Sequence, residues 1–99
     1  MTAISIENQL NKALRFLDLT KYKKASDILY EVIAEARKEN NILFFIRANC
    51  VLGELLYSTG EFDKAKQLLA TVINTPYEND SVAYEKAIAV NILKQIESL

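Results

Sequence analysis

The sequence predicts an all-α fold, a right-handed stack of antiparallel helical hairpins built from about five helices. Apolar residues recur mostly every three or four positions, which places them on one side of a helix. Strand signals are nearly absent, and the 99 residues include only two glycines and one proline. The chain also repeats itself at an offset of 65 − 25 = 40 positions, where identical residues align: Lys24 with Lys64, Ala25 with Ala65, Leu29 with Leu69, Val32 with Val72 and Ile33 with Ile73.

The expected helices follow one another within a single domain, residues 1–99. The helical apolar pattern runs through residues 5–18, 22–38, 41–58, 62–74 and 81–97, and each range is expected to form one helix. A first repeat is assigned to residues 6–40, a second to residues 46–79, and a terminal half repeat or capping helix to residues 81–97.

The first three expected connections between helices, near residues 20, 40 and 60, contain residue types that end or cap helices. Gly60 can adopt the left-handed conformation that closes a helix without a steric penalty from Cβ. Thr20 stands at the same place in the first repeat, so the first turn is expected to be strained or built differently. Asn40 and Asn41 are expected to break the chain between the second and third helices and to cap the third.

The fourth helix is expected to end before Pro76, because proline lacks the donor N–H and clashes with the preceding turn. Asn79, Asp80 and Ser81 follow, and their side-chain oxygens can accept hydrogen bonds from the free N–H groups at the start of the fifth helix.

The third expected helix, residues 41–58, differs from its neighbours in composition. Its only charges are Arg47 and Glu54, and apolar residues occupy nearly all of its sides. A helix of this kind must be covered on more than one side. We therefore expect it to lie in the middle of the stack.

The residues at the expected helix crossings resemble those of the tetratricopeptide repeat. In residues 49–76, Gly53 stands where paired helices of that family approach closest. Gly60 and Phe62 resemble its turn and following aromatic residue, and Ala65 its small residue in the second helix. The first copy is similar through Ala13, Phe16, Tyr22, Ala25, Leu29 and Val32. The resemblance covers roughly two thirds of the chain and implies a module that binds other proteins.

Two features depart from the tetratricopeptide pattern. Gln9 and Asn49 stand where that family usually has a tryptophan-like anchor. The period of 65 − 25 = 40 residues also exceeds the usual repeat length of about 34. The extra length is expected around residues 37–43.

Composition argues against several classes of partner. The net charge of −1 gives no general field that would hold a nucleic acid or an anionic membrane. The longest apolar run, residues 42–46, is far shorter than the roughly 20 residues that span a bilayer. The first ten residues do not resemble a signal peptide, and the single cysteine, Cys50, cannot form an intramolecular disulfide. A cytoplasmic protein is expected.

Residue types that carry common enzyme chemistry are missing or isolated. The chain has no histidine, no glycine-rich phosphate loop and no cysteine cluster with metal-ligand spacing. We therefore expect no cofactor, no metal and no catalysis, although a hydrolase that uses Asp18 or Glu54 stays open. Cys50 is expected to be a buried small hydrophobic residue, because Arg47 is the only cation near enough to activate its thiol.

The resemblance also implies a binding site, because the first helix of each pair lines a concave groove in tetratricopeptide proteins. A peptide or helix of a partner protein is expected there. Leu14 cannot donate hydrogen bonds to an acidic peptide, which favours an apolar or amphipathic occupant. The expected contact residues are Asn11, Leu14 and Asp18 from the first helix, Arg47, Glu54 and Tyr57 from the third, and Tyr84 from the fifth.

Self-assembly is the alternative function, with the groove or the C-terminal helix occupied by another copy of the chain. Residues 81–97 are apolar on more than one side, whereas a capping helix needs a polar outer face. A contiguous apolar patch marks an interface, and identical chains most often associate about a two-fold axis. A homodimer through Ile88, Ile92 and Ile96 is the resulting expectation.

Overall fold

The computed structural model describes residues 2–77 and 80–99, which contain helices and no strand. The elements are α1 (Ala3–Asp18), α2 (Tyr22–Lys38), α3 (Ile42–Ser58), α4 (Phe62–Asn74), the short 3-10 helix η1 (Asp80–Val82) and α5 (Ala83–Glu97). The predicted all-α fold with five main helices is confirmed.

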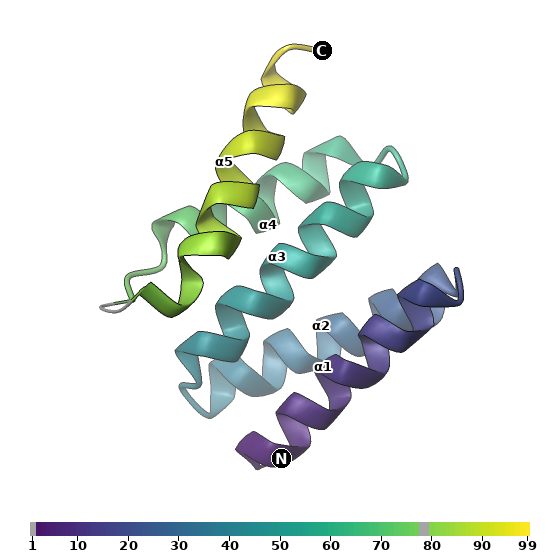
Figure 1. Ribbon diagram of the computed structural model, residues 1–99, viewed down its shortest axis with the longest axis vertical. Coiled ribbons are helices and arrows are strands. Elements are labelled where there is room, and N and C mark those ends of the chain that lie inside the picture. Colours follow the sequence, from purple (N-terminus) through teal and green to yellow (C-terminus); the bar gives the residue numbers. More distant parts are fainter. Residues whose placement is uncertain (1, 78–79) are drawn as a thin grey trace.

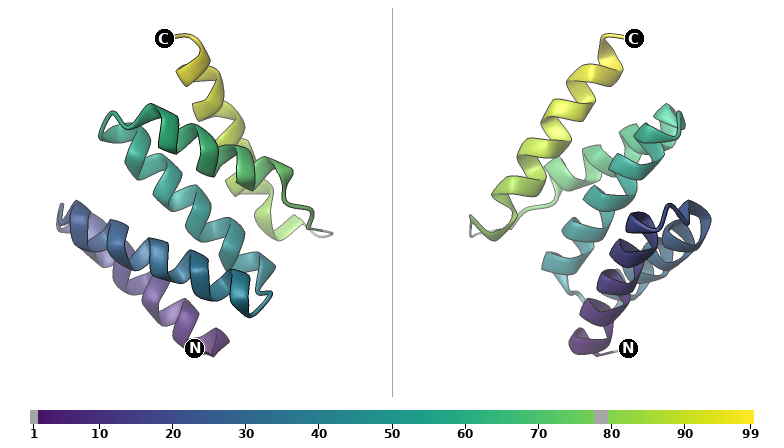
Figure 2. Two further views of the ribbon diagram at one scale, coloured as in Figure 1. Left: turned by 180° about the vertical axis from the view of Figure 1, so that it is seen from behind. Right: turned by 45° about the vertical axis from the view of Figure 1, so that its right-hand side comes forward.

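The helices form two layers. In Figure 1, α1, α3 and α5 lie side by side in front, and α2 and α4 lie behind them. The view from behind in Figure 2 places α2 and α4 in front. The molecule measures 39 × 33 × 19 Å. Helix α3 packs against α2 and α4 and also contacts α1 and α5, as its nearly uniform apolar surface predicted.

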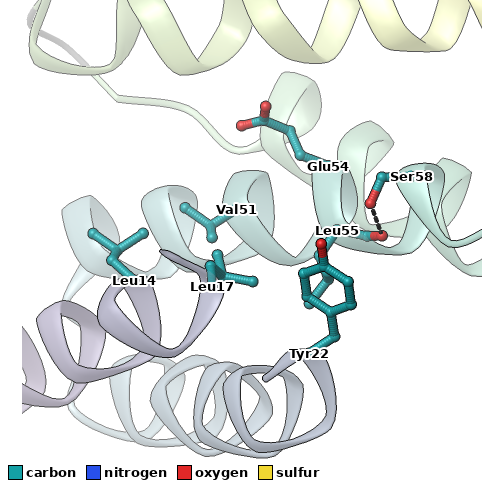
Figure 3. A pocket seen from close by; sticks show the side chains of 7 residues that line it. All are labelled: Leu14, Leu17, Tyr22, Val51, Glu54, Leu55 and Ser58. Carbon is teal, nitrogen blue, oxygen red and sulfur yellow. Dashed lines mark hydrogen bonds between the residues drawn. The ribbon is translucent and has the colours of Figure 1, made fainter. Parts of the chain in front are cut away.

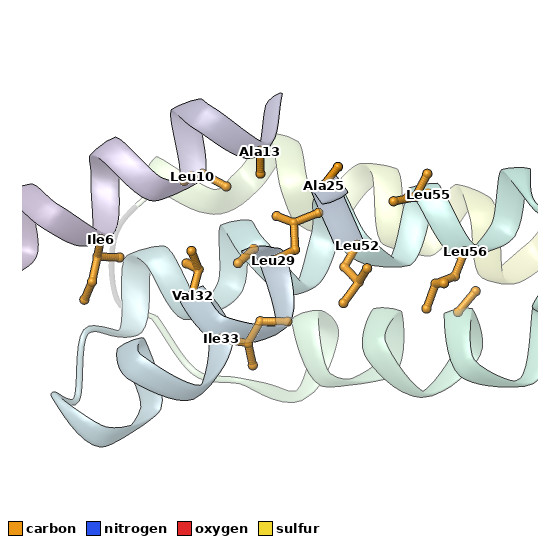
Figure 4. Packing of buried hydrophobic residues seen from close by; sticks show 12 residues of the cluster. Ile6, Leu10, Ala13, Ala25, Leu29, Val32, Ile33, Leu52, Leu55 and Leu56 are labelled. Atoms are coloured by element: carbon orange, nitrogen blue, oxygen red, sulfur yellow. The ribbon is translucent and has the colours of Figure 1, made fainter. Parts of the chain in front are cut away.

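Two clusters of buried residues stabilise the stack on either side of α3. The first joins α1, α2 and α3 and includes Ile6, Leu29 and Leu52, which have no exposed surface (Figure 4). The second lies between α3, α4 and α5 and includes Ile46, Leu69, Val72 and Ala89. Each hairpin thus buries an apolar face that it could not bury alone, as expected for stacked repeats.

The first three connections share one turn. Thr20, Asn40 and Gly60 have positive φ angles of 56°, 55° and 85°. The backbone N–H of the next residue donates a hydrogen bond to a carbonyl oxygen five residues earlier, with an N–O distance of 2.8 Å in all three turns. The bonds run from Lys21 to Phe16, from Asn41 to Ala36 and from Glu61 to Leu56. This pattern is the Schellman motif, which satisfies carbonyl groups at a helix end. The turn at Thr20 is therefore built like the turn at Gly60, with a β-branched residue in the left-handed conformation.

Replacing Thr20 with glycine is expected to stabilise the protein by roughly 0.5–1 kcal/mol, because glycine adopts the left-handed conformation without steric cost. The matched change Gly60→Ala should destabilise by a similar amount, about 1 kcal/mol. A Cβ at Gly60 would meet no atom within 4 Å, so only the backbone angle is tested there. Urea unfolding of both variants measures the two effects. Equal stability of Thr20→Gly and the wild type would show that Thr20 is not strained.

The largest differences from the expected ranges occur at the starts of α1 and α5, and α3 starts one residue later than expected, at Ile42. Helix α1 starts two residues earlier than expected because the Thr2 hydroxyl accepts a hydrogen bond from the Ser5 N–H at 3.1 Å. Helix α5 starts later, because Asp80 and Ser81 belong to η1 and Val82 occupies its N-cap. Asp80 and Ser81 thus lie within η1 rather than directly before α5, and Asn79 lies outside the described residues.

Helices α3 and α4 come into close contact at Gly53. A Cβ built there would lie 2.6 Å from Cδ2 and 2.7 Å from Cγ of Leu69, far inside normal contact distance. Ala13, Ala25 and Ala65 are likewise fully buried. The close approach at Gly53 agrees with the prediction from the repeated pattern, and the three alanines lie in the core, where a small side chain lets helices pack closely.

Candidate functional site

A groove runs along the layer formed by α1, α3 and α5. It consists of two adjoining hollows, of about 340 Å³ and about 190 Å³, which share Leu14, Val51 and Glu54. The lining of these two hollows defines the groove. The larger hollow is also lined by Leu17, Tyr22, Leu55 and Ser58, and the smaller one by Leu10, Arg47, Cys50, Tyr84, Glu85 and Ile88.

The floor of the larger hollow is apolar. Figure 3 shows Leu14 and Leu17 of α1 beside Val51 of α3, with the Tyr22 ring near Leu55. Leu14 and Leu17 stand one helical turn apart, as do Val51 and Leu55, so each helix directs one row of side chains into the hollow. Leu14 is 38% exposed, whereas Leu17 and Val51 beside it are half-buried. An exposed leucine in an apolar hollow offers surface that a ligand can bury.

In the smaller hollow, Arg47 lies near one carboxylate oxygen of Glu85 but leaves the other without a partner among the described residues. The Arg47 Nε lies 3.9 Å from a carboxylate oxygen of Glu85, and the guanidinium stands over the Phe44 ring at 5.8 Å from its centre. The second oxygen of Glu85, Oε2, is buried and has no hydrogen-bond partner among the described residues. Arg47 therefore serves to balance Glu85 and to hold α5 against α3.

Glu54 stands at the junction of the two hollows and has no salt bridge within residues 2–77 and 80–99. The Cys50 thiol donates a weak hydrogen bond to Oε1 of Glu54, with a sulfur–oxygen distance of 3.9 Å. Partial desolvation raises the pKa of the Glu54 carboxyl, and the bond from Cys50 offsets this only in part. Figure 3 shows the carboxylate turned away from the leucine side chains.

Cys50 is a buried thiol. It is 2% exposed, and its sulfur also contacts the Glu85 carbonyl at 3.7 Å. Burial, together with the charges of Glu54 and Glu85, raises the pKa of Cys50 from 9.0 to about 12. Arg47 does not activate this thiol, and Cys50 is the buried small residue that the sequence predicted.

Cys50 should react very slowly with Ellman's reagent at pH 8 in the folded protein. Because its pKa rises from 9.0 to about 12, the thiolate fraction falls about a thousandfold relative to the unfolded chain. The same protein in concentrated guanidinium chloride is the control, and the chain has no other cysteine to confuse the signal. Rapid labelling of native protein would place the thiol at the surface instead.

Four of the seven expected contact residues come together in the smaller hollow. Leu14, Arg47, Glu54 and Tyr84 all line it, and Ile88, expected at a dimer interface, lies beside them. Asn11 and Asp18 are exposed on α1 but line neither hollow.

Tyr57 does not join this group, although it was expected beside Arg47 and Glu54. Its hydroxyl donates a 2.7 Å hydrogen bond to Oε1 of Gln95, and its ring lies 5.6 Å from that of Phe62. Tyr57 is half-buried among α3, α4 and α5. It links these helices and lines neither hollow of the groove.

The apolar surplus expected on α5 is smaller than the sequence suggested. Ile92 and Ile96 are half-buried and pack against the two core clusters. The large apolar residues of α5 that stay exposed are Tyr84, at 75%, and Val90, at 40%. Tyr84 lines the groove, so Val90 is the large exposed apolar residue of α5 outside it.

Several groove residues were missed from the sequence, among them Leu17, Tyr22, Val51 and Glu85. Val51 could have been predicted from the sequence, because it lies one turn beyond Arg47 on the same helix face. Glu85 could not have been predicted in this way, since its place in the groove depends on how α5 crosses α3.

Among the residues described, no group of histidine, cysteine or acidic side chains could hold a metal ion. The described helices include none that is both long and apolar enough to cross a bilayer. The sequence matches no protein-family model, and neither curated proteins nor solved structures gave a significant match.

Proposed function

We propose that this protein is a non-enzymatic, cytoplasmic protein-interaction module of the tetratricopeptide type, which binds a peptide or helix of a partner protein in the groove. The observation that carries the proposal is the continuity of the two hollows through Leu14, Val51 and Glu54. An extended or helical segment can place successive side chains in such adjoining hollows.

The chemistry of the groove suits a peptide better than a compact metabolite. Its floor is formed by leucine, valine and isoleucine side chains, and its edges carry Tyr22, Tyr84 and a few charged groups. Apolar centres with polar or aromatic margins are typical of protein interfaces. The larger hollow, at about 340 Å³, lies at the low end of the usual range for a small-molecule site, roughly 300–1,000 Å³, and the smaller one, at about 190 Å³, lies below it.

The geometry gives little support to a hydrolase. Two carboxylates would have to converge on one substrate bond. Glu54 lines the groove, whereas Asp18 lines neither hollow. The other carboxylate of the groove, Glu85, lies against Arg47.

Selection from a phage-displayed library of 12-residue peptides tests the proposal. Peptides selected on the wild-type protein should lose at least about tenfold in affinity for Leu14→Asp, because a charge then lies in the apolar hollow. Tyr30→Asp is the matched control, since Tyr30 is 46% exposed on α2, outside the groove. If both variants bind the peptides equally, or no peptide is enriched, the groove is not a peptide site.

Self-assembly is the second candidate function, and exposed Tyr84 and Val90 on α5 favour it. Sedimentation equilibrium at 100 μM should then show a dimer that Val90→Glu converts to a monomer. A wild-type protein of 11.2 kDa at this concentration would exclude the candidate.

A further inference from the structure

We propose that the natural occupant of the groove carries a lysine or arginine that pairs with Glu54, flanked on both sides by apolar residues. This inference rests on the proposed function and adds the chemical class of the ligand. The partner is thus a basic amphipathic segment rather than an acidic or purely apolar one.

The charge balance of the groove supports a cationic ligand. Its charged lining residues are Arg47, Glu54 and Glu85, which gives one positive and two negative groups, 1 − 2 = −1. Arg47 and Glu85 lie 3.9 Å apart and offset each other. The remaining negative charge belongs to Glu54, which has no salt bridge among the described residues. A complementary positive group on the ligand would neutralise it and fix the ligand's orientation.

The Glu54 side chain is exposed, so a cationic group of a ligand can reach it. Partial desolvation nevertheless raises the pKa of its carboxyl. An ammonium or guanidinium group at the carboxylate would oppose that effect by favouring the ionised form. The neighbouring thiol of Cys50 is too weak a donor to compete with a cation.

The position of Glu54 also defines the flanking residues. On one side of it lies the hollow lined by Leu17 and Leu55, and on the other the hollow lined by Leu10 and Ile88. Glu54 itself belongs to both. A basic side chain at the junction therefore leaves an apolar site on each side of it, which sets the expected pattern of an apolar, a basic and a second apolar residue.

The 12-residue library, selected in parallel on the wild type, Glu54→Gln and Glu54→Arg, provides the test. Peptides selected on the wild type should be enriched in lysine or arginine between apolar residues. They should bind Glu54→Gln about tenfold more weakly, the size expected for a charged hydrogen bond. Glu54→Arg should instead select peptides with an acidic residue at that position. Glu31→Gln is the matched control, because it removes one exposed glutamate on α2 and should leave affinity unchanged.

Two other results separate the inference from the proposal on which it rests. Peptides that need Leu14 but show no basic residue, and bind Glu54→Gln as tightly as the wild type, would overturn the inference and leave the groove as a peptide site. Peptides that bind Leu14→Asp as well as the wild type would overturn the proposed function and the inference together.

Discussion

Replacing Gly53 with leucine is expected to destabilise the protein by about 3 kcal/mol, the upper end of the usual cost of overpacking. A Cβ alone would lie 2.6 Å from Leu69, a fully buried side chain between α3 and α4. The added isobutyl group must therefore separate the second hairpin. Urea unfolding followed by circular dichroism measures the loss, and an unchanged midpoint would show that no close crossing exists at Gly53.

The smaller change Gly53→Ala isolates the contact with Leu69. In an open helix position alanine would stabilise by about 1 kcal/mol relative to glycine. Here it should destabilise, because its methyl group meets Leu69. Combined with Leu69→Ala, the same change should cost less than it does alone, since residues in contact show non-additive effects. Additive free energies would indicate that the two positions do not touch.

The double replacement Ile92→Glu with Ile96→Glu should destabilise the fold by about 3 kcal/mol. Both side chains are half-buried, and they pack against the two core clusters. Introducing two charges there loses apolar burial and desolvates carboxylates. Thermal unfolding provides the measurement. Val90→Glu, on the exposed side of the same helix, is the control and should cost under about 1 kcal/mol.

This result also bears on self-association. The sequence alone assigned Ile92 and Ile96 to a dimer interface, because the number of apolar residues on α5 exceeded what a cap requires. If the double variant keeps wild-type stability and only changes the oligomeric state, these residues face a second copy rather than the core clusters.

The helices and their order could be predicted from the sequence because local signals define them. The apolar period gave α2 and α4 with their observed ends, and Gly60 and Asn40 marked turns that depend on local backbone conformation. The close contact at Gly53 could also be predicted, since a small residue, Ala13, stands at the same place in the first repeat. Local propensity and tertiary packing agree at these positions.

The groove was less predictable, because it depends on how helices far apart in the chain are placed. The helical period of α1 and of α3 predicted that Leu14 and Glu54 lie on one side of the stack, and both line the smaller hollow. It could not show that Tyr57 is held by Gln95, which comes from α5. The balance of Arg47 by Glu85 likewise depends on the crossing of α3 and α5. Pairings between elements of this kind are not encoded in the spacing along one helix.

The most direct test of the groove is an NMR titration of isotope-labelled protein with a peptide selected on the wild type. The largest methyl shifts are expected at Leu14, Val51 and Ile88, which line the groove from three helices. Shifts confined to residues exposed on α2 and α4, with these three methyl groups unchanged, would contradict binding in the groove and place the binding surface on the opposite layer.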